Sequence, residues 1–266
     1  MIRTATILLL AAALGACSAV PLSAPPAVVA ELAPTGKLRA AINFGNPILA
    51  KKDAASGEAS GVSVDLAREL GRRLGVPVEL VTFTAAGRVT DAARSNIWDI
   101  AFVAIDPVRG ADMDYSAAYV VIEGAYLVPQ GSAIRSNAEV DRKGQRVVVA
   151  RGSAYDLYLS REFKNAQIVR VPTSPEVTDA MVAQKIEVAA GVKQQLEADA
   201  KRVAGVRLLD GRFMVINQAM AAPKGRANGV RFVSDFVEEM KSSGFVADAL
   251  RRHGIQGAAV APAAPR

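Results

Sequence analysis

Short apolar segments that alternate with helix-like segments restrict the fold of this chain more than any other feature. The clearest is residues 99–105, in which six apolar side chains follow Asp99 without polar alternation. Strands of this kind are buried on both faces, as in parallel sheets that helices cover on both sides. Further strands are predicted at residues 38–42, 78–83, 146–150, 168–171 and 187–192.

Helix-like segments fill the intervals between these strands. Apolar side chains recur at every fourth position across residues 62–74 and predict a helix that Gly75 ends. Ser153 and Ser174 are expected to be the N-caps of two more helices. Other helices are expected at residues 88–95 and 230–250, the latter broken at Gly244. Alternating strands and helices predict an α/β protein with mostly parallel sheets.

The N-terminal residues have the order of a secretory signal peptide. Arg3 precedes an apolar run at residues 7–14, and the small residues Gly15 and Ala16 follow it. The run is too short for a transmembrane helix, which needs ~20 apolar residues. Residues 14–17 resemble a bacterial lipobox, in which the cysteine thiol is acylated before cleavage. We therefore expect residues 1–16 to be removed and Cys17 to become the lipid anchor.

Composition predicts where the folded part of the chain begins and ends. Residues 17–35 are rich in Ala, Pro and Ser without a clear period, which predicts a lipidated flexible tether. Residues 256–266 are rich in Ala and Pro and are expected to form a disordered tail. The interval between them is long enough for two lobes.

Charge and rare residues argue against several functions. Without Arg3 the chain has 31 basic and 26 acidic side chains, a net charge of +5. Basic pairs such as Arg72-Arg73 lie in amphipathic stretches and are expected to be solvated, so no nucleic-acid partner is predicted. With one histidine, His253, and one cysteine, the usual zinc ligand sets cannot form, and a catalytic triad would need His253. We expect no metal and no cofactor.

The order of these segments resembles family 3 of the bacterial extracellular solute-binding proteins, the polar amino-acid receptors of ABC importers. Local matches coincide along the chain: residues 36–42 resemble the first strand, 61–76 the first helix, 98–101 the "W-D-hydrophobic-small" strand, 106–119 the "T-x-x-R … F-S-x-P-Y" stretch, and 144–153 the start of a second lobe. Together they extend from about residue 36 to residue 255.

The resemblance implies a two-lobe fold of the type II periplasmic binding protein class, in which each lobe is a mostly parallel sheet flanked by helices. Lobe one is expected at residues 36–127 plus 220–255, and lobe two at residues 128–219. Two crossing segments would join the lobes, and a ligand would be held in the cleft between them.

The resemblance also implies a set of ligand-binding residues. Arg109 occupies the position of the arginine that grips the ligand carboxylate, and a guanidinium gives two parallel hydrogen bonds to one carboxylate. The alternative is a surface arginine paired with Asp106 or Asp112. Ser153 stands where a hydroxyl and a backbone N–H reach the same carboxylate from lobe two, although an N-cap role alone also explains it.

Other positions of the expected site follow the first strand or depart from the family pattern. Asn43, Phe44 and Asn46 fall where polar and aromatic groups wrap the ligand side chain, and a simple turn explains Asn43 and Asn46 equally well. Val192 replaces the aspartate that binds a ligand ammonium group; Asp106 and Ala104 replace a threonine and a serine. Asp106 is a substitute for the lost acid, or the ligand is a carboxylate without an α-ammonium, or the cleft is a degenerate partner surface.

These features predict the substrate-binding component of an ABC importer, lipid-anchored in the periplasm to the inner or outer membrane. It would bind an amino acid or related small carboxylate, perform no chemistry, act as a monomer and deliver its solute to an inner-membrane permease. One alternative is an enzyme on the same scaffold, similar to cyclohexadienyl dehydratase, with Asp106 and Glu123 as candidate acids. The other is a sensor or assembly lipoprotein with a degenerate cleft.

Overall fold

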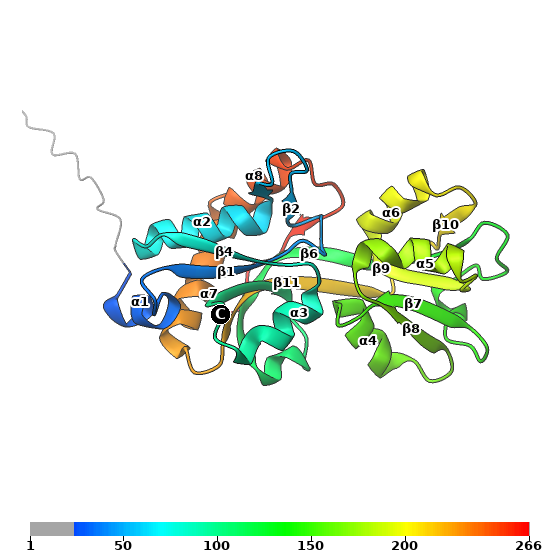
Figure 1. Cartoon of the computed structure of the whole chain (residues 1–266), viewed down its shortest axis with the longest axis horizontal. Helices are drawn as coiled ribbons and strands as arrows, with labels where there is room; N and C mark the ends of the chain where they lie inside the picture. Colours follow the sequence, from blue (N-terminus) through cyan, green and yellow to red (C-terminus); the bar gives the residue numbers. More distant parts are fainter. Residues whose placement is uncertain (1–23, 266) are drawn as a thin grey trace, which may run out of the picture.

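The computed structural model describes residues 24–265. The expected signal peptide and Cys17 lie outside the described residues. Figure 1 shows two groups of elements, lobe one and lobe two, joined by two long strands that run from one group to the other. The predicted α/β class is confirmed.

The elements of lobe one come from both ends of the described chain. They are α1 (Pro26–Leu32), β1 (Leu38–Asn43), β2 (Lys51–Lys52), β3 (Ala59–Ser60), α2 (Val62–Leu74), β4 (Val78–Phe83), α3 (Ala86–Asp91), β5 (Ile100–Ala104), α7 (Ala227–Ser242), α8 (Phe245–Arg252) and β12 (Ala259–Val260). The two joining strands are β6 (Met113–Pro129) and β11 (Met214–Pro223). Short 3-10 turns, η1 (Ala92–Arg94) and η2 (Arg109–Ala111), flank β5.

Lobe two is continuous between the joining strands. Its elements are η3 (Asn137–Glu139), β7 (Arg146–Ala150), α4 (Ala154–Glu162), β8 (Gln167–Val171), η4 (Ser174–Glu176), α5 (Val177–Ala183), β9 (Val188–Val192), α6 (Lys193–Arg202) and β10 (Val206–Leu208). Both N-cap predictions can be compared here. Ser153 caps α4 by accepting a hydrogen bond from the Asp156 N–H, as predicted. Ser174 instead begins η4, and its predecessor Thr173 is the N-cap residue.

The main sheet has the order β4-β1-β5-β11-β6-β9-β7-β8. β4, β1 and β5 are parallel in lobe one, and β9, β7 and β8 are parallel in lobe two. β11 and β6 pair antiparallel between these two units. Parallel strands point their carboxyl ends the same way, so each lobe presents its strand ends as one edge.

The strand predicted at residues 99–105 forms as β5 and is buried on both faces, as expected, but it ends at Ala104, and Ile105 is exposed. All five residues of β5 are buried. Ile100 and Phe102 belong to the large core that includes α2, whereas Ala101 and Val103 face a second cluster with Trp98. Helices therefore cover both faces of the lobe-one sheet, as a parallel arrangement requires.

Sequence patterning did not predict β6 and β11, although they connect the lobes. Buried and half-buried positions follow one another irregularly along β6, because its neighbours change from β11 and β12 to β9 and β10. The lobe limits expected at residues 127 and 219 fall inside these strands. β6 already pairs with lobe-two strand β9 at Gly124, and β11 pairs with lobe-one strand β5 from Gln218 onward.

The tether predicted at residues 17–35 is wrong over its last part. Helix α1 begins at Pro26, and Val28 and Leu32 on one of its faces are buried in the core. The Glu31 carboxylate accepts hydrogen bonds from the Gly229 N–H and the Asn228 side chain at the start of α7. Ala/Pro composition suggested flexibility, but a proline at the first helical position and two apolar residues four apart are enough for a docked helix.

The disordered tail predicted at residues 256–266 is also wrong over the described residues. β12 pairs antiparallel with β6, Val260 opposite Val120. Ala261 is buried, and the Lys241 ammonium donates to the Pro262 carbonyl. Adding a short strand to the exposed edge of β6 satisfies backbone groups that composition alone does not reveal.

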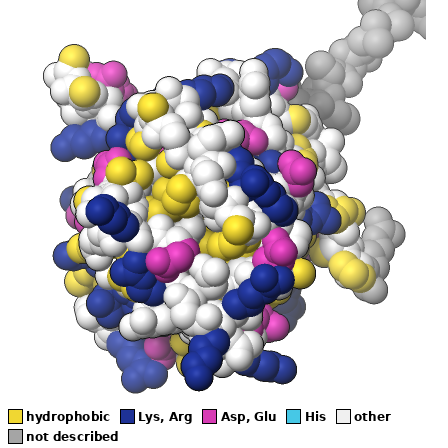
Figure 2. All heavy atoms as spheres, turned by 90° about the vertical axis from the view of Figure 1, so that its right-hand side faces the viewer, with side chains coloured by type: hydrophobic (Ala, Val, Ile, Leu, Met, Phe, Trp, Pro, Cys, Tyr) yellow, Lys and Arg dark blue, Asp and Glu magenta, His cyan; other side chains and the backbone are white. Residues whose placement is uncertain are grey.

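The surface has mixed charge. Figure 2 views the molecule from its lobe-two end, where Lys and Arg side chains are interspersed with Asp and Glu. Within residues 24–265 no helix is long and apolar enough to cross a membrane.

Candidate functional site

A small cavity lies where the carboxyl ends of parallel strands from the two lobes meet. Asn43 ends β1 and Ala104 ends β5 in lobe one, while Ser153 follows β7 and Val192 ends β9 in lobe two. All four residues line this cavity, whose volume is about 40 Å³. Strand ends of an α/β sheet are where such folds bind ligands. The cavity is therefore the candidate site, and in this conformation the lobes are closed around it.

Arg109 is buried and lines this cavity. Its guanidinium donates to the Ala104 carbonyl at 2.9 Å and, across the cleft, to the Gly152 carbonyl at 2.8 Å. The Nε atom has no hydrogen-bond partner among the described residues. Burial lowers the pKa of Arg109 below its usual value. A buried guanidinium with unused donors is suited to an anion.

The surface-pairing alternative for Arg109 is wrong. Asp106 instead forms a 2.9 Å ion pair with Arg161 of lobe two and accepts a hydrogen bond from the Val108 N–H. Asp112 pairs with Arg94. No ion pair within residues 24–265 involves Arg109, so its charge has no carboxylate partner in that part of the chain.

Ser153 and Asn43 lie in the cavity wall, and each also has a local structural role. The Ser153 N–H donates to the Ala150 carbonyl. Of the two Ser153 groups expected to contact the ligand, only the hydroxyl is therefore available. Asn43 Oδ1 accepts the Gly45 N–H in the turn after β1. Asn46, three residues on, lines the cavity with a buried Oδ1 that has no hydrogen-bond partner among the described residues.

Two of the predicted site residues lie outside the cavity lining. Phe44 is half-buried and packs against the main core, because the turn directs it away from the strand edge. Asp106 is only 4% exposed but is held by Arg161 at the side of the cleft. Its carbonyl accepts a hydrogen bond from the Tyr115 hydroxyl, and Tyr115 also lies outside the cavity lining.

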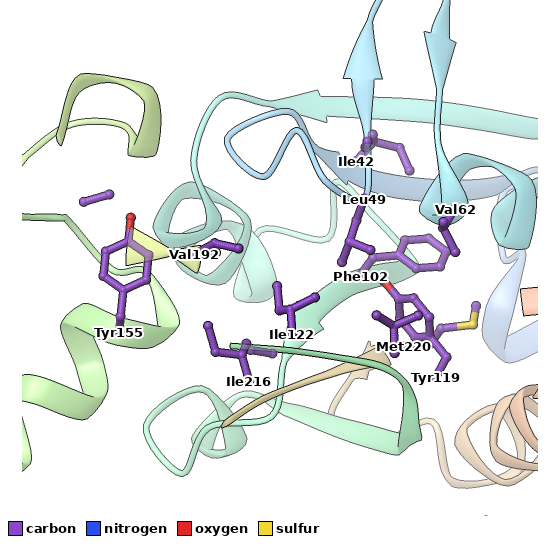
Figure 3. Close-up of a cluster of buried hydrophobic side chains, with 14 of the residues drawn as sticks. Ile42, Leu49, Val62, Phe102, Tyr119, Ile122, Tyr155, Val192, Ile216 and Met220 are labelled. Carbon is purple, nitrogen blue, oxygen red and sulfur yellow. The ribbon is translucent and has the colours of Figure 1, made fainter. Parts of the chain in front are cut away.

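Val192 contributes an apolar wall to the cavity, as the replacement of an acid predicts. Figure 3 shows Val192 beside Tyr155 on the lobe-two side, with Ile122 and Ile216 between them and the cluster around Phe102. Burial raises the pKa of Tyr155 to about 12, and its hydroxyl donates to Ser174 Oγ, so it lines the cavity as a neutral group.

Several lining residues were missed by sequence reasoning. Gln218 lies on β11 and is buried, in a strand that the pattern did not predict. A glutamine within the apolar segment 214–223 was the available signal, because a buried amide needs polar partners. The other missed lining residues are Gly45, Ala86, Phe102, Val103, Ala154, Tyr155, Ser174 and Ile216.

Close backbone contact brings the lobes together beside the cavity. Gly152 has φ +68°, and a Cβ added there would lie 2.7 Å from Gly87 Cα in α3 of lobe one. The Arg109 hydrogen bond to Gly152 and the Asp106–Arg161 ion pair cross the cleft at the same place. Only glycine fits at residue 152 in this contact. Because the two glycines belong to different lobes, the contact is specific to a closed arrangement of the lobes.

Glu123, one of the two acids considered for catalysis, does not have the pKa shift that a general acid needs. Glu123 pairs with Lys193 and Arg212, and the hydrogen bond from Arg212 leads the effects that lower its pKa. A catalytic acid needs the opposite shift. His253 contacts Asp65 on α2 and lies outside the cavity lining. Among the described residues no cluster of His, Cys, Asp and Glu is suited to a metal ion.

Solved structures share this fold over most of the chain. A variant of ArgBP from T. maritima superposes with a TM-score of 0.74 at 18% identity, covering 86% of this chain and 100% of that one. The solute receptors for L-cysteine of Neisseria gonorrhoeae superpose with a TM-score of 0.73 at 22% sequence identity, covering 85% of this chain and 92% of that one. The ancestral amino acid-binding protein AncCDT-1, a precursor of cyclohexadienyl dehydratase, superposes with a TM-score of 0.71 at 23% sequence identity, covering 84% of this chain and 98% of that one. At these identities the likeness establishes the fold.

Comparison at the level of sequence gives the family. A search of curated proteins found no match. Residues 38–255, most of the chain, match the bacterial extracellular solute-binding proteins, family 3. The chain therefore belongs to family 3 of the bacterial extracellular solute-binding proteins.

Proposed function

We propose that this chain is the solute-binding component of a bacterial ABC importer and closes its two lobes over a small carboxylate. The single observation that carries the proposal is Arg109, a buried guanidinium that lines the interlobe cavity with no carboxylate partner among the described residues. Burying a charge is costly unless an opposite charge compensates it. A ligand carboxylate supplies that compensation, so closure and binding stabilise each other.

The proposal includes the compartment and partners. Cys17 is the lipid anchor after removal of residues 1–16, the body works in the periplasm as a monomer, and the solute passes to an inner-membrane permease. Solved relatives named for L-cysteine and for amino acids make amino acids and related carboxylates the first solutes to test.

We further propose that the protein carries out no reaction. Asp106 and Glu123, the acids considered for a dehydratase-like activity, are both committed to ion pairs. The hydrogen bonds from Arg212 and Lys193 lower the pKa of Glu123, and an acid held ionised is a poor proton donor at neutral pH.

Calorimetric titration of the mature chain tests the binding role. We expect heat from at least one member of a panel of amino acids and small carboxylates. Arg109→Lys should weaken that binding at least ~10-fold, since lysine cannot form the bidentate contact, and Arg109→Ala should abolish it. Arg94→Ala is the matched control, because Arg94 pairs with Asp112 outside the cavity. Equal binding by wild type and the Arg109 variants, or no heat at millimolar solute, would refute the proposal.

A further inference from the structure

The charges around the cavity restrict the kind of carboxylate that fits. Fifteen residues line the cavity, and Arg109 is the one charged side chain among them. The remaining lining groups are neutral: amides such as Gln218, hydroxyls such as Ser174, and apolar side chains such as Val192. The cavity therefore offers one positive charge and no negative charge.

Asp106, three residues before Arg109 in the chain, cannot supply the missing negative charge. Its carboxylate is 4% exposed, pairs with Arg161 at 2.9 Å and accepts the Val108 N–H at 2.8 Å. Arg161 comes from lobe two, so this ion pair joins the two lobes across the cleft. Turning Asp106 toward a ligand would leave Arg161 without its partner.

Electroneutrality then distinguishes two classes of ligand. A carboxylate without an ammonium group cancels the charge of Arg109, and the closed cavity becomes neutral. An amino-acid zwitterion adds no net charge, so the cavity keeps one positive charge, and the ligand ammonium lies near a guanidinium without a facing acid. Neutral acceptors such as Asn46 Oδ1 can bond an ammonium or a hydroxyl, but they do not cancel a charge.

The surface beside the cavity is also positively charged. A hollow of about 590 Å³ lies at the Gly87–Gly152 contact. Arg88 and Arg151, one from each lobe, line this hollow with Asp91; its third arginine, Arg170, is paired with Asp156. Positive groups near a cleft raise the rate at which an anionic ligand arrives.

We infer that the solute of this protein is a small anionic carboxylate without an ammonium group, such as a 2-hydroxy acid or an unsubstituted carboxylic acid. This inference rests on the proposed function and adds the class of ligand to it. The cavity of about 40 Å³ in the closed form favours the smaller members of the class.

Matched ligand sets test this inference on the wild-type mature chain. Each set contains an L-amino acid, its 2-hydroxy analogue and its 2-deamino analogue, which differ only at the α-substituent; L-alanine, L-lactate and propionate are the smallest set. We expect the tightest-binding set to favour its anions over its amino acid by at least 100-fold. An amino acid that binds more tightly than its anionic analogues would overturn the inference and leave the solute-binding role intact. No binding by any set would overturn the role itself.

A charge introduced into the cavity tests whether the cavity's net charge sets the preference for anions over amino acids. Val192→Asp adds an acid at the lobe-two wall, and we expect the ratio of anion to amino-acid affinity to fall at least 10-fold. Val182→Asp is the matched control, because Val182 is exposed on α5 of the same lobe and should leave the ratio unchanged. The same ratio in Val192→Asp as in wild type would overturn the argument from charge.

Discussion

At the scale of single residues, Asp99 shows how a buried charge is accommodated away from the cavity. Its carboxylate is fully buried and pairs with Arg39 at 2.8 Å and Arg226 at 2.9 Å. Removing one partner of a buried ion pair costs roughly 3 kcal/mol or more of unfolding free energy. We therefore expect Asp99→Asn to lower stability by roughly 3 kcal/mol in urea denaturation. Asp114→Asn, which breaks the exposed pair with Lys224, should cost less than about 1 kcal/mol.

The stability supplied by Asp99 also depends on pH. Burial opposes its ionisation, but hydrogen bonds from Arg39 and Arg226 outweigh burial and lower its pKa. A depressed folded-state pKa stabilises the protein above the unfolded pKa of about 3.9 and loses that contribution as pH falls through the folded pKa. The stability gap between wild type and Asp99→Asn should therefore shrink below about pH 4. A gap that widens on acidification would contradict this assignment.

At the scale of elements, α1 depends on a close contact with α7. Leu32 is fully buried, and a Cβ added to Gly229 would lie 2.7 Å from Leu32 Cδ2. Leu32→Ala should cost roughly 3 kcal/mol, and Gly229→Ala should cost about 1–3 kcal/mol by overpacking.

A double-mutant cycle isolates this contact. In the Leu32→Ala background the clash is gone, so Gly229→Ala should become neutral or stabilising by up to about 1 kcal/mol, because alanine is the better helix former. Additive costs in the double variant would mean that α1 does not pack on α7 as described.

The same elements explain what sequence reasoning achieved. Segments with a uniform environment were predicted well: β5 is buried on both faces, and α2 keeps one apolar face before Gly75 takes the left-handed conformation. α1 and β12 were missed because a short segment gains its stability from tertiary contacts rather than from its own period. β6 was missed because its neighbours change along its length.

In the candidate site too, features set by the local sequence were predicted and features set by tertiary contacts were not. Arg109, Ser153, Ala104 and Val192 were located through local motifs at strand ends, and all four line the cavity. Motif matching does not reveal where a side chain points, so Phe44 and Asp106 were expected in the site but lie outside its lining. Their positions are set by core packing and by Arg161, which is distant in sequence.

At the scale of the whole molecule, the contact between Gly87 and Gly152 connects closure with the site. Any side chain at residue 152 would meet the Gly87 backbone at 2.7 Å and separate the lobes beside Arg109. Gly152→Ala should therefore favour an open form, with a larger radius of gyration in small-angle scattering and weaker solute binding.

Backbone strain has to be separated from this effect on closure, because Gly152 has φ +68°. Gly144 provides the match: its φ is +88°, and an added Cβ would meet nothing within 4 Å. Both alanine variants should lose roughly 1–2 kcal/mol of unfolding free energy, since each forces alanine into the left-handed region. Expansion and weaker binding should accompany Gly152→Ala alone, because closure requires the close approach of two lobes at that position. Equal scattering profiles for the two variants would mean that this contact does not control closure.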